Sequence, residues 1–111
     1  MATLNLAEYE KEALNNLILS LKTKWPTANF KIFGSKVKGI ADKESDIDLL
    51  IVLPCEVTGD IRSQIIKEVF NINLSYGSNI SVLIVSEEEW QRGKISVLPI
   101  RYFIEKEGMP L

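Results

Sequence analysis

The chain has 111 residues, of which 46% are hydrophobic and 25% charged, a composition typical of one folded globular domain. A formal net charge of -2 argues against extended nucleic-acid binding, although a single nucleotide needs only a few local donors. The absence of histidine excludes Ser-His-Asp and Cys-His catalysis and every zinc site built on histidine. We therefore expect any chemistry to depend on carboxylates, hydroxyls, lysines, arginines or a hard metal ion.

The sequence shows no feature of secretion or of membrane insertion. The single cysteine, Cys55, cannot form an internal disulfide, and the first residues lack the basic and apolar regions of a signal peptide. The longest apolar run covers residues 49–53, far short of the roughly 20 residues that span a bilayer. We expect one cytoplasmic domain over residues 1–111 with no membrane segment.

In the first half of the chain, apolar spacing predicts a helix over residues 6–24, with Asn5 as its N-cap and Trp25-Pro26 as its end. A short aromatic and β-branched run predicts a strand over residues 29–33 that stops at Gly34-Ser35. A turn and a short helix are expected over residues 35–42.

In the second half, residues 46–53 predict a central strand, because the run is apolar on both faces towards its end. A helix is expected over residues 60–74, where an apolar stripe recurs at helical spacing: Ile61, Ile65, Ile66, Val69, Phe70 and Leu74. A strand over 80–85 follows, then a helix that begins at the Ser86–Glu89 capping box and is interrupted at Gly93, and a last helix over 99–107. This order of elements predicts an α/β domain.

The Gly34-Ser35 turn joins a predicted strand to a predicted helix. Glycine lets a ligand approach the backbone closely, and the free amides of a helix N-terminus favour a phosphate. Ser35 adds a hydroxyl donor, and Lys36 and Lys38 add positive charge. Taken alone, the same residues also fit an ordinary turn with an N-cap.

Two aspartates, Asp46 and Asp48, stand one residue apart at the head of the predicted central strand. Strand side chains alternate, so both carboxylates point to one face. Their mutual repulsion is relieved by a cation, and Mg²⁺ prefers such oxygen ligands together with substrate phosphates. The alternative is a solvent-exposed entry to the strand in which Ser45 and Asp46 finish a turn.

Together these residues read G-S-x3-G-x5-S-D-x-D before an apolar strand, with Gly34, Ser35, Gly39, Ser45, Asp46 and Asp48 at the specified positions. This pattern resembles the signature of the DNA polymerase beta-like nucleotidyltransferases, especially their minimal members, and the order of elements is similar along nearly the whole chain. The resemblance implies a nucleotidyltransferase fold, a small mixed β-sheet of three or more strands flanked by helices. It also implies transfer of a nucleoside monophosphate from a triphosphate to a hydroxyl acceptor.

The resemblance assigns roles to particular residues. Asp46 and Asp48 would be catalytic and would bind Mg²⁺ or Mn²⁺. The nucleotide-binding residues would be Gly34, Ser35, Lys36, Lys38 and Ser45. For Lys36 and Lys38, a place as surface lysines on a short helix is the alternative.

One position departs from the pattern of active relatives, which usually carry a third carboxylate on the third strand. Ser81 aligns best with the position of that carboxylate, and Asn79 lies on the same face of the strand as Ser81. The alternative is that one of Glu87, Glu88 and Glu89 reaches back to the site.

Two hypotheses about the function therefore stay open. The chain is either a metal-dependent nucleotidyltransferase or a catalytically degenerate nucleotide-binding module, an antitoxin that pairs with a HEPN-type partner protein. A chain this short favours an acceptor site supplied by a partner or by a second copy, and the base, the acceptor and the oligomeric state stay open.

Overall fold

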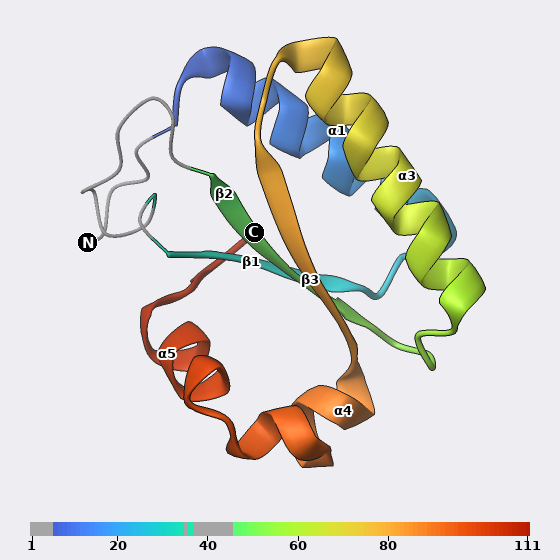
Figure 1. Cartoon of the computed structure of the whole chain (residues 1–111), viewed down its shortest axis with the longest axis vertical. Coiled ribbons are helices and arrows are strands. Elements are labelled where there is room, and N and C mark those ends of the chain that lie inside the picture. The colour runs from blue at the N-terminus through green and yellow to red at the C-terminus, as the bar shows by residue number, and fades with distance from the viewer. Residues whose placement is uncertain (1–5, 35, 37–45) are drawn as a thin grey trace.

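A mixed sheet carries helices on both of its faces (Figure 1). The computed structural model describes residues 6–34, 36 and 46–111. Within these residues the elements are, in chain order, α1 (Glu8–Lys24), β1 (Asn29–Phe33), β2 (Ile47–Leu53), α3 (Gly59–Tyr76), β3 (Ile80–Ser86), α4 (Glu87–Arg92), the 3-10 helix η1 (Lys94–Val97), α5 (Pro99–Glu107) and β4 (Met109–Pro110). The strand order is β3-β2-β1-β4, with β2 parallel to β3 and β1 antiparallel to both β2 and β4. The predicted α/β class and the central position of β2 are confirmed.

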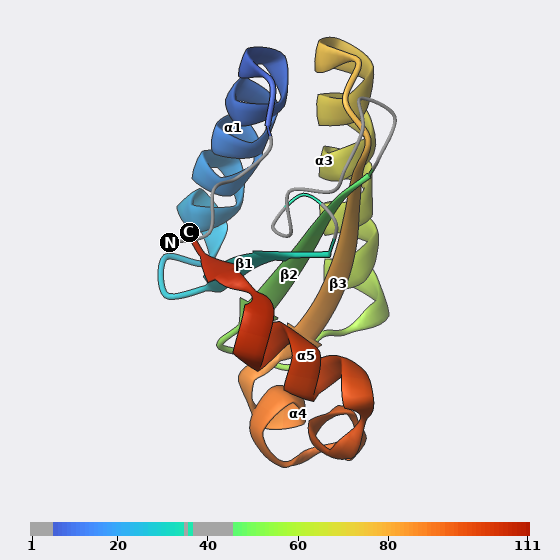
Figure 2. The ribbon, with the colours of Figure 1, turned by 90° about the vertical axis from the view of Figure 1, so that its left-hand side faces the viewer.

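The alternation of side chains along β2 divides the interior into two clusters. Ile47, Leu49, Ile51 and Leu53 pack with α1 and α3, whereas Leu50 and Val52 pack with Trp90 of α4 and Ile104 of α5. Figure 2 shows the result from the side, with α1 and α3 beyond one face of the sheet and α4 and α5 beyond the other. The odd-numbered residues of β2 therefore face α1 and α3, and the even-numbered residues face α4 and α5.

Most helix and strand boundaries agree with the sequence-based expectation, because local signals set them. The Thr58 hydroxyl accepts a hydrogen bond from the Ile61 amide at 3.2 Å and caps α3, and Gly77 ends that helix in the left-handed conformation with φ 67°. The Ser86 capping box starts α4 as predicted. The expectation for α3 was short by one residue at its start and by two at its end.

Two expectations at the ends of the chain were wrong. Helix α1 begins at Glu8 with Ala7 as its N-cap, so Asn5, which lies outside the described residues, does not cap it. The Glu10 carboxylate sets this start, because it accepts a hydrogen bond from the Ala7 amide at 3.0 Å. Strand β4 was not predicted, since two residues that include a proline carry no periodic pattern.

The turn and short helix expected over residues 35–42 lie outside the described residues, apart from Lys36. In the part of the chain that the structure describes, no helix combines the length and the apolar character needed to cross a membrane.

Candidate functional site

The two aspartates lie where β2 begins, beside the end of β1. Asp46 directly precedes β2 and Asp48 is its second residue, so both share the face of Leu50 and Val52, which α4 and α5 cover. Asp48 is paired in register with Phe33, the last residue of β1. Gly34 directly follows Phe33, so the candidate phosphate-binding turn lies next to the Asp48 carboxylate.

Gly34 makes a contact with Asp48 that a larger residue could not make. Its φ is 81°, in the left-handed region that favours glycine. A Cβ built on Gly34 would lie closer than 3.0 Å to Asp48 Oδ2, and no real Cβ takes such a distance. The backbone of the turn therefore rests directly against the carboxylate, and glycine is needed for both reasons.

Ser81 completes this edge of the site from β3. It is paired in register with Asp48, and its hydroxyl lies 3.4 Å from Asp46 Oδ2, at the long limit of a hydrogen bond. The start of β3 is held there because the Ile47 amide donates to the Asn79 carbonyl at 2.8 Å. Ser81 thus stands beside both aspartates and offers a neutral hydroxyl.

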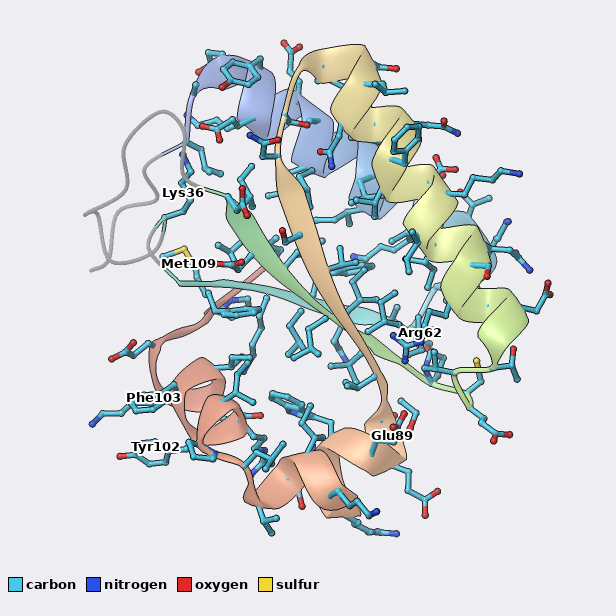
Figure 3. All side chains as sticks on the ribbon, in the orientation of Figure 1. Lys36, Arg62, Glu89, Tyr102, Phe103 and Met109 are labelled. Carbon is cyan, nitrogen blue, oxygen red and sulfur yellow. The ribbon has the colours of Figure 1, made fainter. Side chains whose placement is uncertain are left out.

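The alternative in which a glutamate of α4 reaches back to the site is wrong. Glu87, Glu88 and Glu89 follow β3 at its far end, and Ser86 lies five residue steps along the strand from Ser81, a span of about 16 Å. Glu89 is engaged in the cap of α4, where its carboxylate accepts from the Ser86 amide at 3.0 Å. Figure 3 shows Glu89 beside α4, at the opposite end of the domain from Lys36.

The surroundings of Asp48 make its negative charge unfavourable. Burial raises the pKa of this carboxyl above its ordinary value, and the neighbouring Asp46 charge raises it further. A bound cation would offset both effects. Among the described residues no group of three or more acidic or cysteine side chains could hold a metal ion, and metal binding by Asp46 and Asp48 stays a prediction.

Lys36 is buried and paired with an acidic side chain, an environment that the sequence did not predict. Its side chain is only 1% exposed, so it is not a surface lysine, and its Nζ lies 3.2 Å from Glu10 Oε2. Glu10 is itself 5% exposed and also fixes the start of α1. Figure 3 shows Lys36 beside the N-terminal end of α1. The ion pair therefore ties Lys36 to α1, and nucleotide binding by Lys36 stays a prediction.

Sequence reasoning missed Glu10, although a signal was present. Glu10 precedes Ala13, Leu14 and Leu17 at helical spacing, so it is an acidic residue on the buried face of α1. A buried carboxylate needs a partner with which to pair, so this position indicates an ion pair or a hydrogen bond.

Four residues of the predicted motif and nucleotide site lie outside the described residues, and their roles stay predictions: Ser35, Lys38, Gly39 and Ser45.

A pocket of about 340 Å³ opens beside the turn. Six residues of β1, the turn and α5 line it: Phe33, Gly34, Ile100, Phe103, Ile104 and Glu107. This pocket could not be predicted from the sequence, because no local pattern indicates that α5 lies next to Gly34. A larger hollow of about 560 Å³ lies at the other end of β2 and β3, lined by residues 54–57 and 86–89, and does not touch the aspartates.

Comparison with known proteins agrees with this geometry. The family model of the nucleotidyltransferase domain matches residues 14–108, which include both aspartates, the Gly34 turn and α5. No curated protein and no solved structure matches the chain. Because the family match extends over most of the sequence, the chain belongs to the nucleotidyltransferase domain family.

Proposed function

We propose that the chain binds a nucleoside triphosphate together with Mg²⁺ or Mn²⁺ and transfers its nucleoside monophosphate to a hydroxyl acceptor. The acceptor oxygen forms a bond to the α-phosphorus while the bond from that phosphorus to the bridging oxygen breaks. Pyrophosphate leaves, and the acceptor hydroxyl loses its proton. The observation that supports this function is the contact of the Asp48 carboxylate with the Gly34 backbone, with Asp46 on the same face.

The residues present fit a divalent cation. Nucleotidyltransferases generally use divalent metals, and Asp46 and Asp48 supply the hard carboxylate oxygens that Mg²⁺ and Mn²⁺ prefer. Burial and like charge raise the pKa of Asp48, so its ionised form gains from a positive neighbour. When bound, the metal would neutralise charge on the phosphates and orient them.

The chain's own groups would position the nucleotide. Gly34 has no side chain and a left-handed backbone, so phosphate oxygens can approach the turn closely. The Lys36–Glu10 ion pair anchors Lys36, two residues after Gly34, to α1. Asp48 projects from a central strand whose other residues are buried, which limits its movement, and Asp46 directly precedes that strand.

A second candidate function is favoured by Ser81. Its hydroxyl stands beside Asp46 where active relatives usually carry an acidic group, and loss of one anionic ligand weakens a two-metal site. In this alternative the domain binds a nucleotide without turning it over and acts as an antitoxin with a HEPN-type partner. In either case we propose that a partner protein or a second copy supplies the acceptor site.

Calorimetry tests the binding step that both functions share. Non-hydrolysable nucleoside triphosphates and Mg²⁺ should bind more tightly together than separately, because phosphate oxygens complete the coordination of the metal. The double substitution Asp46→Asn/Asp48→Asn should abolish that gain. Asp60→Asn is the matched control, since Asp60 lies in the first turn of α3 and hydrogen-bonds Gln64. Cooperative binding that survives the double substitution would refute the proposed site.

A further inference from the structure

Apart from Gly34 and the charged Glu107, the residues that line the pocket beside Gly34 are apolar. Phe33 of β1 and Ile100, Phe103 and Ile104 of α5 supply its apolar walls. Phe103 is 53% exposed, although it lines a hollow rather than a flat surface. A volume of about 340 Å³ falls at the lower end of the range for small-molecule sites, about 300–1,000 Å³. Such walls suit a flat, weakly polar group and offer little to a phosphate.

Contacts with β1 and α4 hold in place the wall of the pocket that α5 forms. Strand β4, which follows the helix, pairs with β1 at Ile32 and Lys31. Glu105 accepts a hydrogen bond from the Trp90 ring nitrogen at 2.6 Å and lies 3.3 Å from Lys31 Nζ. The pocket is therefore formed before any ligand binds, which lowers the entropic cost of binding.

The arrangement of the strands indicates which part of the reaction this pocket serves. Gly34 follows β1 on one side of β2, and Ser81 lies in β3 on the other side. With the departing phosphates at Gly34, a hydroxyl that attacks in line must approach the α-phosphorus from the opposite direction. The acceptor therefore enters from the side of Ser81, and the pocket on the side of Gly34 is left to the nucleotide itself.

We propose that this pocket binds the base of the nucleotide, with the face of the base stacked on Phe103. The inference rests on the proposed function, because it takes the phosphates to lie at Gly34. Stacking on an aromatic side chain tolerates every base, so Phe103 contributes affinity for nucleotides over inorganic phosphates. Tyr102 of the same helix is 59% exposed and does not line the pocket, but its ring packs edge-on against Phe103, with 5.6 Å between the ring centroids. Figure 3 shows both side chains on α5.

The test uses calorimetry in the presence of Mg²⁺ to measure the affinity of two ligands for wild type and for each variant. One ligand is inorganic tripolyphosphate, which has no base, and the other is a non-hydrolysable triphosphate, tried with each of the four bases. Wild type should bind the best nucleotide more tightly than tripolyphosphate. Phe103→Ala should weaken that nucleotide about 10-fold, equivalent to about 1.4 kcal/mol, and leave tripolyphosphate binding unchanged. Phe103→Trp should keep the affinity, and the control Phe70→Ala, which removes a 60% exposed aromatic side chain of α3, should leave both ligands unaffected.

The outcomes separate the inference from the function on which it rests. Unchanged nucleotide affinity in Phe103→Ala, with both ligands binding to wild type, would overturn the base pocket and leave the proposed function standing. Equal weakening of both ligands would also overturn it, because a base pocket cannot affect tripolyphosphate. If neither ligand binds to wild type, the proposed function itself fails.

Discussion

Replacing Gly34 with alanine should destabilise the fold and displace the Asp48 carboxylate in one step. A non-glycine residue held at φ 81° costs about 1–2 kcal/mol. The new Cβ would also lie closer than 3.0 Å to Asp48 Oδ2, so the carboxylate must leave its present rotamer, which costs about 0.5–1.5 kcal/mol. We expect a total loss of about 2–3 kcal/mol in the free energy of unfolding.

The two contributions can be separated because the clash involves only the end of the Asp48 side chain. The Cβ of Asp48 would lie 3.5 Å from the new methyl group, an ordinary van der Waals distance. In the Asp48→Ala background, Gly34→Ala should therefore cost only the backbone part, about 1–2 kcal/mol. The coupling between the two positions should be about 1 kcal/mol, within the range for residues in contact.

Urea unfolding of wild type, the two single variants and the double variant measures this coupling at constant m value. Gly77→Ala is the matched control, since Gly77 has a φ of 67° and nothing within 4 Å of an added Cβ. Gly77→Ala should lower the free energy of unfolding only by the cost of the left-handed backbone, whether or not Asp48 is present. If Gly34→Ala costs no more than Gly77→Ala, and costs the same in both Asp48 backgrounds, the contact between the turn and the carboxylate is refuted.

Two further predictions concern the carboxylates. Asp48→Asn should raise the Tm of the metal-free protein at pH 7, because the raised pKa of Asp48 makes its ionised form unfavourable in the folded state. The gain should vanish below the ordinary pKa of an aspartate, where Asp48 is protonated in both states, and a lower Tm at pH 7 would contradict it. Ser81→Asp should raise label transfer from radioactive triphosphates to protein and RNA acceptors about 10-fold with Mn²⁺, or about 1.4 kcal/mol of barrier. Robust wild-type transfer that does not increase in this variant would show a site complete without a third carboxylate.

The sequence predicted the elements whose ends depend on local chemistry. The bounds of β1 and α5 were predicted to the residue, since a glycine turn ends the first and a proline and a glycine delimit the second. The alternation of strand side chains likewise predicts a common face for Asp46 and Asp48. In the structure Asp48 shares the face of Leu50, and the Asp46 carboxylate lies beside Ser81, which is paired with Asp48. The nucleotide and metal roles of these residues stay predictions.

Features that depend on contacts between distant segments could not be predicted. The helical stripe in α3 suggested a wide buried face, yet Ile65 and Val69 are buried while Ile66, Phe70 and Leu74 are exposed. Helical spacing records which residues share a side, but the neighbouring elements decide how much of that side is covered. The same limit hid the Glu10–Lys36 ion pair, whose members stand 26 residues apart in the chain.

A single face of β2 passes from polar to apolar within a few residues, and the candidate site lies at that boundary. Leu50 and Val52 are sealed under α4 and α5, whereas Asp46, four residues before Leu50, is exposed. Asp48 stands between them, half-buried, and this intermediate position raises its pKa. Where the cover of α5 ends, Phe103 and Gly34 border an open pocket instead of a closed core. One boundary therefore brings together an unfavourable charge that a cation would relieve and an apolar surface that a base would cover.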